Sequence, residues 1–470
     1  MALSMFERFC HDRVALRFEG AEAGIEPLTW GQKAFLQDMQ ESGNQFSMGG
    51  MLGLPEGGTV EDAVALVSGL IGRHAALRMR LDTDDAGRLC QDVAASGRMD
   101  LNIVTIPHDA DRSDVERYAA DLMTDWPSER FDFHRDWPLR MALVEHRGSC
   151  LYLVWVLSHL VADGGAHLLL LDDMLAHRGG AGPTPDARSQ ILDIARREKT
   201  QNVRQVSSRA MRYWESQLKH VPAQTFGEPV RPPDQAGHRY WQVRFGSPAA
   251  HLAVLAIGRR TGTDVSRVTL AVVATAIARV IGVNPLTIKV MVNNRFMPGM
   301  ADVIAPIAQN SVLTIDTADV SIDEVVVRAR SAMLSAGMRA YYDPDELREV
   351  SARLDAQRGY PATVTCRIND QRVMVMRAES DEAAGEITPQ QVRQRLAESS
   401  LTWLGPREHM HEQANILIEN KSDVLSLHMM WDLWSLTISQ VEALMRAVED
   451  VAVEAAFDPA APTKVSTLNI

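Results

Sequence analysis

The segment Ser158-His159-Leu160-Val161-Ala162-Asp163-Gly164 carries residue types and a spacing that suit an active-site loop. A histidine has an unperturbed pKa of about 6.5, so the neutral ring of His159 can accept a proton near pH 7. Asp163 either orients that ring or anchors the loop through an ion pair. Gly164 allows backbone or substrate to approach closely. The alternative is a structural histidine with satisfied hydrogen bonds, and the spacing alone does not exclude it.

The elements around His159 favour a functional site. The pattern predicts a hairpin with strands at 139–144 and 151–157 and a turn at 146–149. The second strand is apolar at almost every position, which is typical of a strand covered on both faces. A leucine-rich helix is expected over 166–177. His159 therefore follows the end of a buried strand and precedes a helix, where open α/β sheets commonly bind ligands.

Strands and helices alternate in both halves of the chain, which predicts a duplicated α/β unit. A length of 470 residues suits two domains of about 200 residues each. The further expected strands are 14–18, 286–292 and 362–366, and the further expected helices are 60–71 with a Thr59 cap, 266–280 and 437–456. Glycines and prolines after position 178 predict a linker at 179–188 between lobes 1–178 and 189–470.

Composition excludes several classes of partner. The formal charge is -13, from 61 acidic and 48 basic residues, so nucleic acid and anionic membranes are not expected partners. Local basic clusters can still dock an acidic carrier protein. The four cysteines show no C-x-x-C spacing, so neither a metal site nor a disulfide framework is expected. The start shows no signal peptide and no apolar run is long enough to span a membrane, so we expect a cytoplasmic protein.

Five segments occur in the order found in one known family. They are Leu28-Thr29-Trp30-Gly31-Gln32, Arg73-His74-Ala75-Ala76-Leu77-Arg78, His159 to Gly164, Tyr213-Trp214 and Gln309-Asn310-Ser311. On these residues the chain resembles the condensation domains of nonribosomal peptide synthesis, which belong with the chloramphenicol-acetyltransferase-like acyltransferases. The resemblance covers nearly the whole chain. It implies an α/β fold of two acetyltransferase-like lobes in a V with a central tunnel.

The resemblance also implies a role for each residue of the site. His159 is the expected catalytic residue, as a base or as a group that orients the nucleophile. Asp163 and Gly164 are expected to be structural, with Arg78 or Arg295 as the ion-pair partner of Asp163. The residues expected to line the substrate tunnel are Ser158, Gly165, Asn310 and Ser311.

The implied activity is acyl transfer in natural-product biosynthesis. An acyl or aminoacyl thioester on the phosphopantetheine arm of an acyl or peptidyl carrier protein would react with an amine or alcohol. The acceptor would be a free small molecule or a second carrier, and no cofactor would be permanently bound. The alternatives are transfer from acyl-coenzyme A and a catalytically silent recruitment domain.

Two departures from the family pattern bear on these roles. The family usually has two adjacent histidines, and Ser158 replaces the first of them. The late motifs around 341–344 and 366–370 match poorly, which affects the acceptor side.

The chain begins and ends near the borders of one condensation unit, so a free-standing enzyme is expected.

Overall fold

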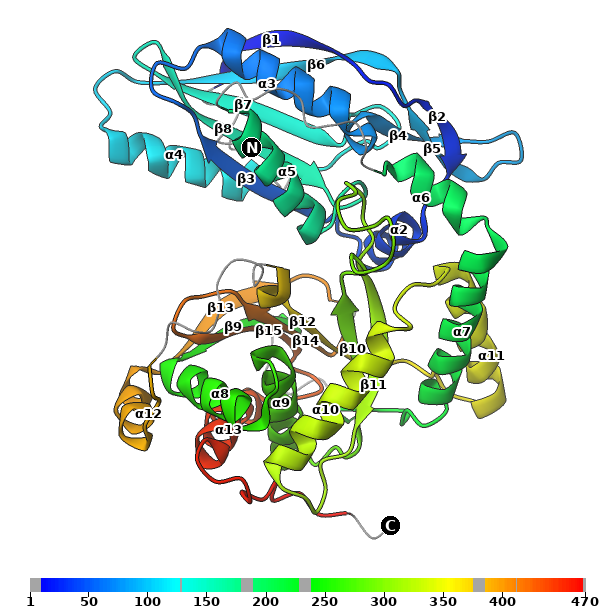
Figure 1. Ribbon diagram of the computed structural model, residues 1–470, viewed down its shortest axis with the longest axis vertical. Helices are drawn as coiled ribbons and strands as arrows, with labels where there is room; N and C mark the ends of the chain where they lie inside the picture. Colours follow the sequence, from blue (N-terminus) through cyan, green and yellow to red (C-terminus); the bar gives the residue numbers. More distant parts are fainter. Residues whose placement is uncertain are drawn as a thin grey trace. The chain divides into compact units, whose positions relative to one another are not determined.

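A computed structural model describes residues 10–126, 129–178, 189–227, 238–374, 385–410 and 412–467. The chain divides into two compact units. The first comprises Met1–Arg204 and Asn293–Ala308, and the second comprises Gln205–Val292 and Gln309–Ile470. Each unit is a mixed α/β structure built around a sheet of its own (Figure 1).

The first unit contains a five-stranded sheet, with strand order β1-β6-β7-β8-β3, and a small three-stranded sheet, with order β2-β5-β4. The strands are β1 (Cys10–Glu19), β2 (Gly24–Pro27), β3 (Ser47–Gly53), β4 (Met79–Thr83), β5 (Leu89–Val93), β6 (Ser96–Ile106), β7 (Leu139–His146) and β8 (Ser149–Ser158). The helices are α2 (Trp30–Ser42), α3 (Val60–Arg73), the 3-10 helix η1 (Ala75–Arg78), α4 (Arg112–Asp125), α5 (Gly164–His177) and α6 (Ile191–Glu198).

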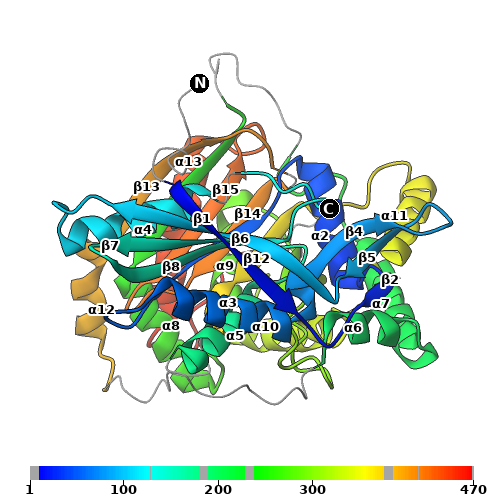
Figure 2. The same ribbon diagram turned by 90° about the horizontal axis from the view of Figure 1, so that it is seen from above.

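Helices cover both faces of the five-stranded sheet. On one face, Val154 and Val156 of β8 pack with Val115 and Ala119 of α4. Helices α3 and α5 lie on the opposite face (Figures 1 and 2). The expectation of a strand buried on both sides before His159 is therefore confirmed. Strand β8 is an inner strand between β7 and the edge strand β3.

The predicted hairpin and the predicted cap of the first helix are also confirmed. Strands β7 and β8 pair antiparallel, and Arg147 and Gly148 take φ angles of 54° and 80° at the turn. A two-residue turn with positive φ at both positions matches the twist of a hairpin. Thr59 and Asp62 form a reciprocal capping box at the start of α3.

The second unit contains a seven-stranded sheet with order β11-β10-β12-β14-β15-β9-β13. The strands are β9 (Tyr240–Ser247), β10 (Leu286–Val292), β11 (Gln309–Ile315), β12 (Cys366–Asp370), β13 (Ser400–Arg407), β14 (Ala414–Glu419) and β15 (Leu425–Asp432). The helices are α7 (Gln201–Leu218), α8 (Pro248–Thr261), α9 (Val265–Ile281), α10 (Ile322–Gly337), α11 (Pro344–Arg358), α12 (Pro389–Arg395) and α13 (Ile438–Ala455), with short 3-10 turns η3 (Gln371–Met374) and η5 (Leu396–Glu398). The division between the units falls within α7.

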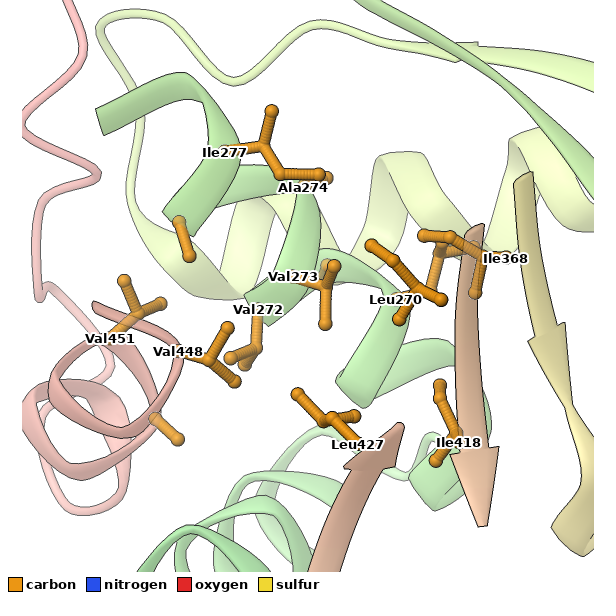
Figure 3. Packing of buried hydrophobic residues seen from close by; sticks show 14 of the residues in the cluster. Leu270, Val272, Val273, Ala274, Ile277, Ile368, Ile418, Leu427, Val448 and Val451 are labelled. Carbon is orange, nitrogen blue, oxygen red and sulfur yellow. The ribbon is translucent and has the colours of Figure 1, made fainter. Parts of the chain in front are cut away.

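One face of the seven-stranded sheet is apolar and forms the main core. Its side chains pack against α8, α9, α10 and α13. Figure 3 shows Val273 of α9 and Val448 of α13 in the same cluster as Ile418 and Leu427 of the sheet. Because successive strand residues point to opposite faces, the other face carries the alternate side chains, many of them polar.

One predicted strand differs from the structure. The predicted strand 362–366 is wrong: residues 361–365 are irregular, and β12 begins at Cys366. Ala362 and Val364 are apolar because they pack against α7 and α11, not because they belong to the sheet. The predicted linker 179–188 lies outside the described residues.

The predicted lobe boundaries also differ from the compact units. Residues up to Arg204 belong to the first unit, because α6 is tied to it. Arg196 Nε donates to Glu26 Oε1 at 3.0 Å, and Glu198 accepts from the backbone N–H of Trp30 at 2.9 Å. The first unit also includes Asn293–Ala308 from the middle of the second half of the sequence.

Candidate active site

The end of β8 turns sharply into the loop that carries His159. The Ser158 N–H donates to Pro138 O at 2.9 Å, and the Ser158 hydroxyl accepts from the Leu160 N–H at 3.1 Å. The Val161 N–H closes the turn on Ser158 O at 3.2 Å. Ser158 is 1% exposed, and its hydroxyl is used to hold the loop. The expectation that Ser158 lines a substrate passage is therefore not supported.

The imidazole of His159 is positioned by two aromatic rings. It stacks on Phe35 of α2, with centroids 4.8 Å apart and planes at 16°, and meets Phe46 edge to face at 6.4 Å and 82°. The His159 N–H donates to Phe46 O at 2.9 Å, which fixes the backbone beside β3. The residue is half-buried. Its ring therefore has a defined plane before any substrate binds.

Burial lowers the pKa of His159 to about 4. The negative charge of Asp163 and the backbone of Ala162 favour the protonated ring but offset this effect only in part, while His167 lowers the pKa further. Nδ1 is buried and has no hydrogen bond of regular geometry in the described part of the chain. Because its pKa is lowered, the ring is neutral at pH 7. Because Nδ1 is buried, Nε2 is the ring nitrogen left to contact a substrate.

A second histidine beside His159 is held neutral by a tryptophan. Trp155 Nε1 donates to His167 Nε2 at 3.0 Å, so this nitrogen of His167 carries no proton. Burial also lowers the pKa of His167. The Trp155 ring lies over Gly50 of β3, where a Cβ would be 2.2 Å from the indole. The pair of Trp155 and His167 was not predicted from the sequence. The signal that could have indicated it is the position of His167, one helical turn after Asp163.

Asp163 is a structural anchor whose carboxylate is saturated. As the N-cap of α5 it accepts from the Ala166 N–H at 2.8 Å through Oδ1, which also accepts from Arg295 Nη2 at 2.6 Å. Oδ2 accepts from the N–H groups of Ile307 and Ala308, both at 2.9 Å. Asp163 is 3% exposed. Four donors on one buried carboxylate leave it no free lone pair aimed at a substrate.

The ion-pair partner of Asp163 is Arg295, and Arg78 is not. Arg78 is 1% exposed and donates instead to the carbonyls of Ile71, Glu22 and Ala94. Arg295 also donates from Nη1 to Val303 O at 2.9 Å, so it supports the Asn293–Ala308 segment from within.

Gly165 allows the Arg295 side chain to cross the start of α5. A Cβ at position 165 would lie 2.3 Å from Arg295 Nε. The requirement for glycine here comes from this crossing, so the expected role of Gly165 in the tunnel has no support in the local geometry. Gly164 is the first residue of α5.

We expect Gly165→Ala to lower the free energy of unfolding by about 1–3 kcal/mol, because the new methyl group must displace a buried guanidinium. Gly337→Ala at the end of α10 is the matched control, since nothing lies within 4 Å of the point that its methyl group would occupy. That change should be neutral or stabilising by up to about 1 kcal/mol. Urea titration of both variants measures the difference. Equal effects at the two positions would contradict the steric explanation.

Asn310 and Ser311 lie in the second unit and point to opposite faces of its sheet. The Ser311 hydroxyl donates to Ala336 O at 2.9 Å, and the residue is fully buried on the helix side. Its expected place in a substrate tunnel is therefore not supported. Asn310 lies on the polar face, and its Oδ1 is buried without a hydrogen-bond partner among the described residues. Asn310 remains a candidate for substrate contact.

The described residues offer no other reaction centre of the kinds considered. No group of three or more histidine, cysteine, aspartate or glutamate side chains among them is placed to hold a metal ion. Burial raises the pKa of the Cys150 and Cys366 thiols, which disfavours the nucleophilic thiolate. No helix in the described ranges is long and apolar enough to cross a membrane.

Comparison with known proteins identifies the family. The condensation-domain family model matches residues 22–383. This match extends over most of the sequence, so the chain belongs to the condensation-domain family. A curated relative, the probable non-canonical nonribosomal peptide synthetase CymA of Salinispora arenicola, is 26% identical over 289 residues, or 58% of this chain. The chain matches only 4% of the length of that relative.

Solved structures share the fold at low identity. The condensation domain that mediates chain release from the enacyloxin polyketide synthase has a TM-score of 0.68 at 17% identity, covering 92% of this chain and 83% of that one. SgcC5 from Streptomyces globisporus has a TM-score of 0.66 at 18% identity, covering 93% and 100%. The X-domain from teicoplanin biosynthesis has a TM-score of 0.64 at 18% identity, covering 94% and 97%. A further solved structure is a complex of that X-domain with OxyB.

Proposed function

We propose that this protein is an acyltransferase that condenses a carrier-bound acyl or aminoacyl thioester with an amine or alcohol, using His159 as the base. The observation that carries the proposal is a half-buried imidazole, neutral at pH 7, held between two aromatic rings where β8 meets α5. Membership of the condensation-domain family supports the reaction class.

In the proposed reaction a C–O or C–N bond replaces the C–S bond of the thioester, and one proton moves from the nucleophile to the departing sulfur. Nε2 of His159 takes the proton from the attacking hydroxyl or amine while the new C–O or C–N bond forms at the thioester carbonyl. The tetrahedral intermediate then expels the thiolate, which receives that proton from the ring. A base with a pKa of about 4 is weak, so proton transfer must accompany bond formation rather than precede it. Asp163 takes no proton in this scheme because its oxygens are occupied.

Membership of the family favours the phosphopantetheine arm of a carrier protein as the donor. Acyl-coenzyme A presents the same thioester and is the alternative donor. A recruitment role is the alternative from another class, and the complex of the X-domain with OxyB supports considering it. The basis for recruitment is a likeness of fold only.

The test supplies matched acyl groups on a carrier protein and on coenzyme A, with a panel of amines and alcohols, and identifies products by mass. We expect an amide or ester from the carrier-bound thioester at a rate above that from coenzyme A. Equal rates from the two donors, after correction for hydrolysis, would favour the coenzyme A reaction. Detectable carrier binding with no product from any acceptor would favour recruitment.

The acid limb of the pH profile should reflect the lowered pKa of His159. With an alcohol acceptor, which does not titrate in this range, kcat/KM should stay level from neutral pH and fall only near pH 4, where the ring gains a proton. With an amine acceptor the limb should move up toward the pKa of the ammonium group. Initial rates over pH 4–8 measure this. A midpoint near pH 6.5 with the alcohol would contradict it.

The same lowered pKa makes stability pH-dependent, so the rate assay needs a folding control. The unfolded chain binds a proton at His159 below about pH 6.5, while the folded chain does so only near pH 4. Stability should therefore fall as the pH drops through this window. Circular dichroism at each pH confirms that the rates come from folded protein.

A further inference from the structure

The protonated form of His159 needs a source of stabilisation, because burial disfavours its charge. Burial is the largest cause that lowers the pKa of the ring to about 4. Nδ1 is buried and makes no hydrogen bond of regular geometry within the described residues. Asp163 favours the charged ring, but its carboxylate lies 2.6 Å from Arg295 Nη2, which offsets most of its charge. The ring therefore depends on other neighbours when it holds a proton.

His167 does not supply this stabilisation. Trp155 Nε1 donates to Nε2 of His167 at 3.0 Å, and the two rings meet edge to face with centroids 5.7 Å apart. This donor favours the neutral form of His167, whose positive charge would lower the pKa of His159. Asp163 and His167 are the titratable side chains that act on the pKa of His159. The hydrogen bond from Trp155 thus keeps a second positive charge away from His159 without stabilising the first.

The face of Phe35 is placed to stabilise a charged imidazole. Its ring centroid lies 4.8 Å from that of His159, and the two ring planes are inclined by 16°. The face of a benzene ring carries negative partial charge, and a cation within about 6 Å of its centroid is attracted to it. A stacked imidazolium gains this attraction, whereas a neutral imidazole gains much less. The contact therefore favours the charged form of His159 over the neutral form.

Both rings are held in place before a substrate binds. Phe35 lies in the second turn of α2, whose start is fixed by the capping box of Thr29 and Gln32. The His159 N–H donates to Phe46 O at 2.9 Å, and the Phe46 ring meets the imidazole edge to face at 82°. Phe35 and His159 are half-buried, so their contact is partly desolvated. The attraction between a cation and an aromatic face is stronger there than in open water.

We propose that Phe35 is a positioning residue that stabilises the protonated imidazole of His159 through the face of its ring. The charge exists from the moment Nε2 takes the proton of the nucleophile until the departing sulfur receives that proton. Phe35 forms and breaks no bond, and it lowers the free energy of the state in which the ring is charged. The catalytic meaning of this inference rests on the proposed acyl transfer. The attraction between the two rings does not, so it can be tested without a substrate.

The test replaces Phe35 with mono-, di- and trifluorinated phenylalanine, which weakens the negative face in steps at nearly constant volume. We expect the titration midpoint of His159, followed by NMR of isotope-labelled histidine, to fall by about 0.5–1.5 pH units over the series. With an alcohol acceptor, kcat should fall in parallel by about 3-fold to 30-fold while KM stays unchanged. His159→Gln identifies the NMR signal by its loss.

Two controls separate the charge effect from a structural role. Trifluorinated phenylalanine at Phe457, an exposed residue of the second unit, should change neither the midpoint nor kcat. Phe35→Tyr keeps an aromatic face and should retain kcat within about threefold.

Three outcomes decide the matter. A midpoint and a kcat that do not respond to fluorination of Phe35 would overturn the proposal. A lower kcat with a higher KM and a lower urea midpoint would also overturn it, because these changes indicate a structural role. A falling midpoint in a protein that transfers no acyl group would support the stabilising contact between the rings and contradict the proposed function instead.

Discussion

Replacing His159 with alanine is expected to lower kcat/KM for acyl transfer by about a hundredfold to ten-thousandfold. The variant loses the nitrogen that accepts the proton of the nucleophile, so the uncharged attacking group must lose its proton to water instead. Binding of the carrier should change little, because the substitution removes a single half-buried ring from the loop. The measurement is the single-turnover rate, with mass detection of the product, beside the affinity for the acyl carrier.

The His159→Ala result needs two controls. The His159 ring fills the space between Phe35 and Phe46, so its removal could disturb the loop. His159→Gln restores polar volume without an imidazole and should be as inactive as His159→Ala. His134→Ala removes an exposed histidine of the same unit and should be fully active. An unchanged product yield from His159→Ala would remove the enzymatic proposal and leave a binding role.

The sequence predicts those parts of the fold that depend on neighbouring residues. The hairpin β7–β8, the cap of α3 by Thr59 and Asp62, and the helices α9 and α13 all have local signals in period, turn residues and caps. Local periodicity failed at 362–366. There the apolar residues pack on two helices distant in sequence, and a short apolar run does not distinguish that environment from a strand.

The sequence predicts His159 and the loop that carries it, but not the contacts that hold this loop in place. The spacing of His159 and Asp163 indicates a loop between strand and helix, but the partners of Asp163 other than Ala166 lie 132 to 145 positions away in sequence. The choice between Arg78 and Arg295 depends on which arginine reaches the loop in space, and no local pattern contains that information. Gly165 illustrates the same limit, because an arginine crossing and a substrate passage both require glycine.

The hydrogen bonds and ion pair of Asp163 explain how the loop that carries His159 is kept in place. Asp163 joins the start of α5 to Arg295 and to the amides of Ile307 and Ala308. Loss of this anchor would release the loop of which His159 is a part. Stability and activity should therefore depend on the same ion pair, although Asp163 takes no part in the chemistry.

Replacing Arg295 with methionine is expected to cost about 3–5 kcal/mol of unfolding free energy in the first unit, because it leaves a buried carboxylate without its cation. Hydrogen exchange should accelerate at Ala166, Ile307 and Ala308, whose N–H groups donate to Asp163. The rate of acyl transfer should fall together with the stability. Arg98→Met replaces an exposed arginine of the same unit and should leave all three measurements unchanged.

The double variant Asp163→Asn with Arg295→Met separates the cost of an unpaired charge from the worth of the pair. Replacing both partners removes the uncompensated carboxylate, so the double variant should be more stable than Arg295→Met alone. The amide oxygen of asparagine can still accept from a backbone N–H, which preserves part of the cap. The comparison also needs the single variant Asp163→Asn. If the costs of Asp163→Asn and Arg295→Met simply add in the double variant, the ion pair is not coupled. The stability of the loop would then have to come from the hydrogen bonds that the backbone N–H groups of Ala166, Ile307 and Ala308 donate to residue 163.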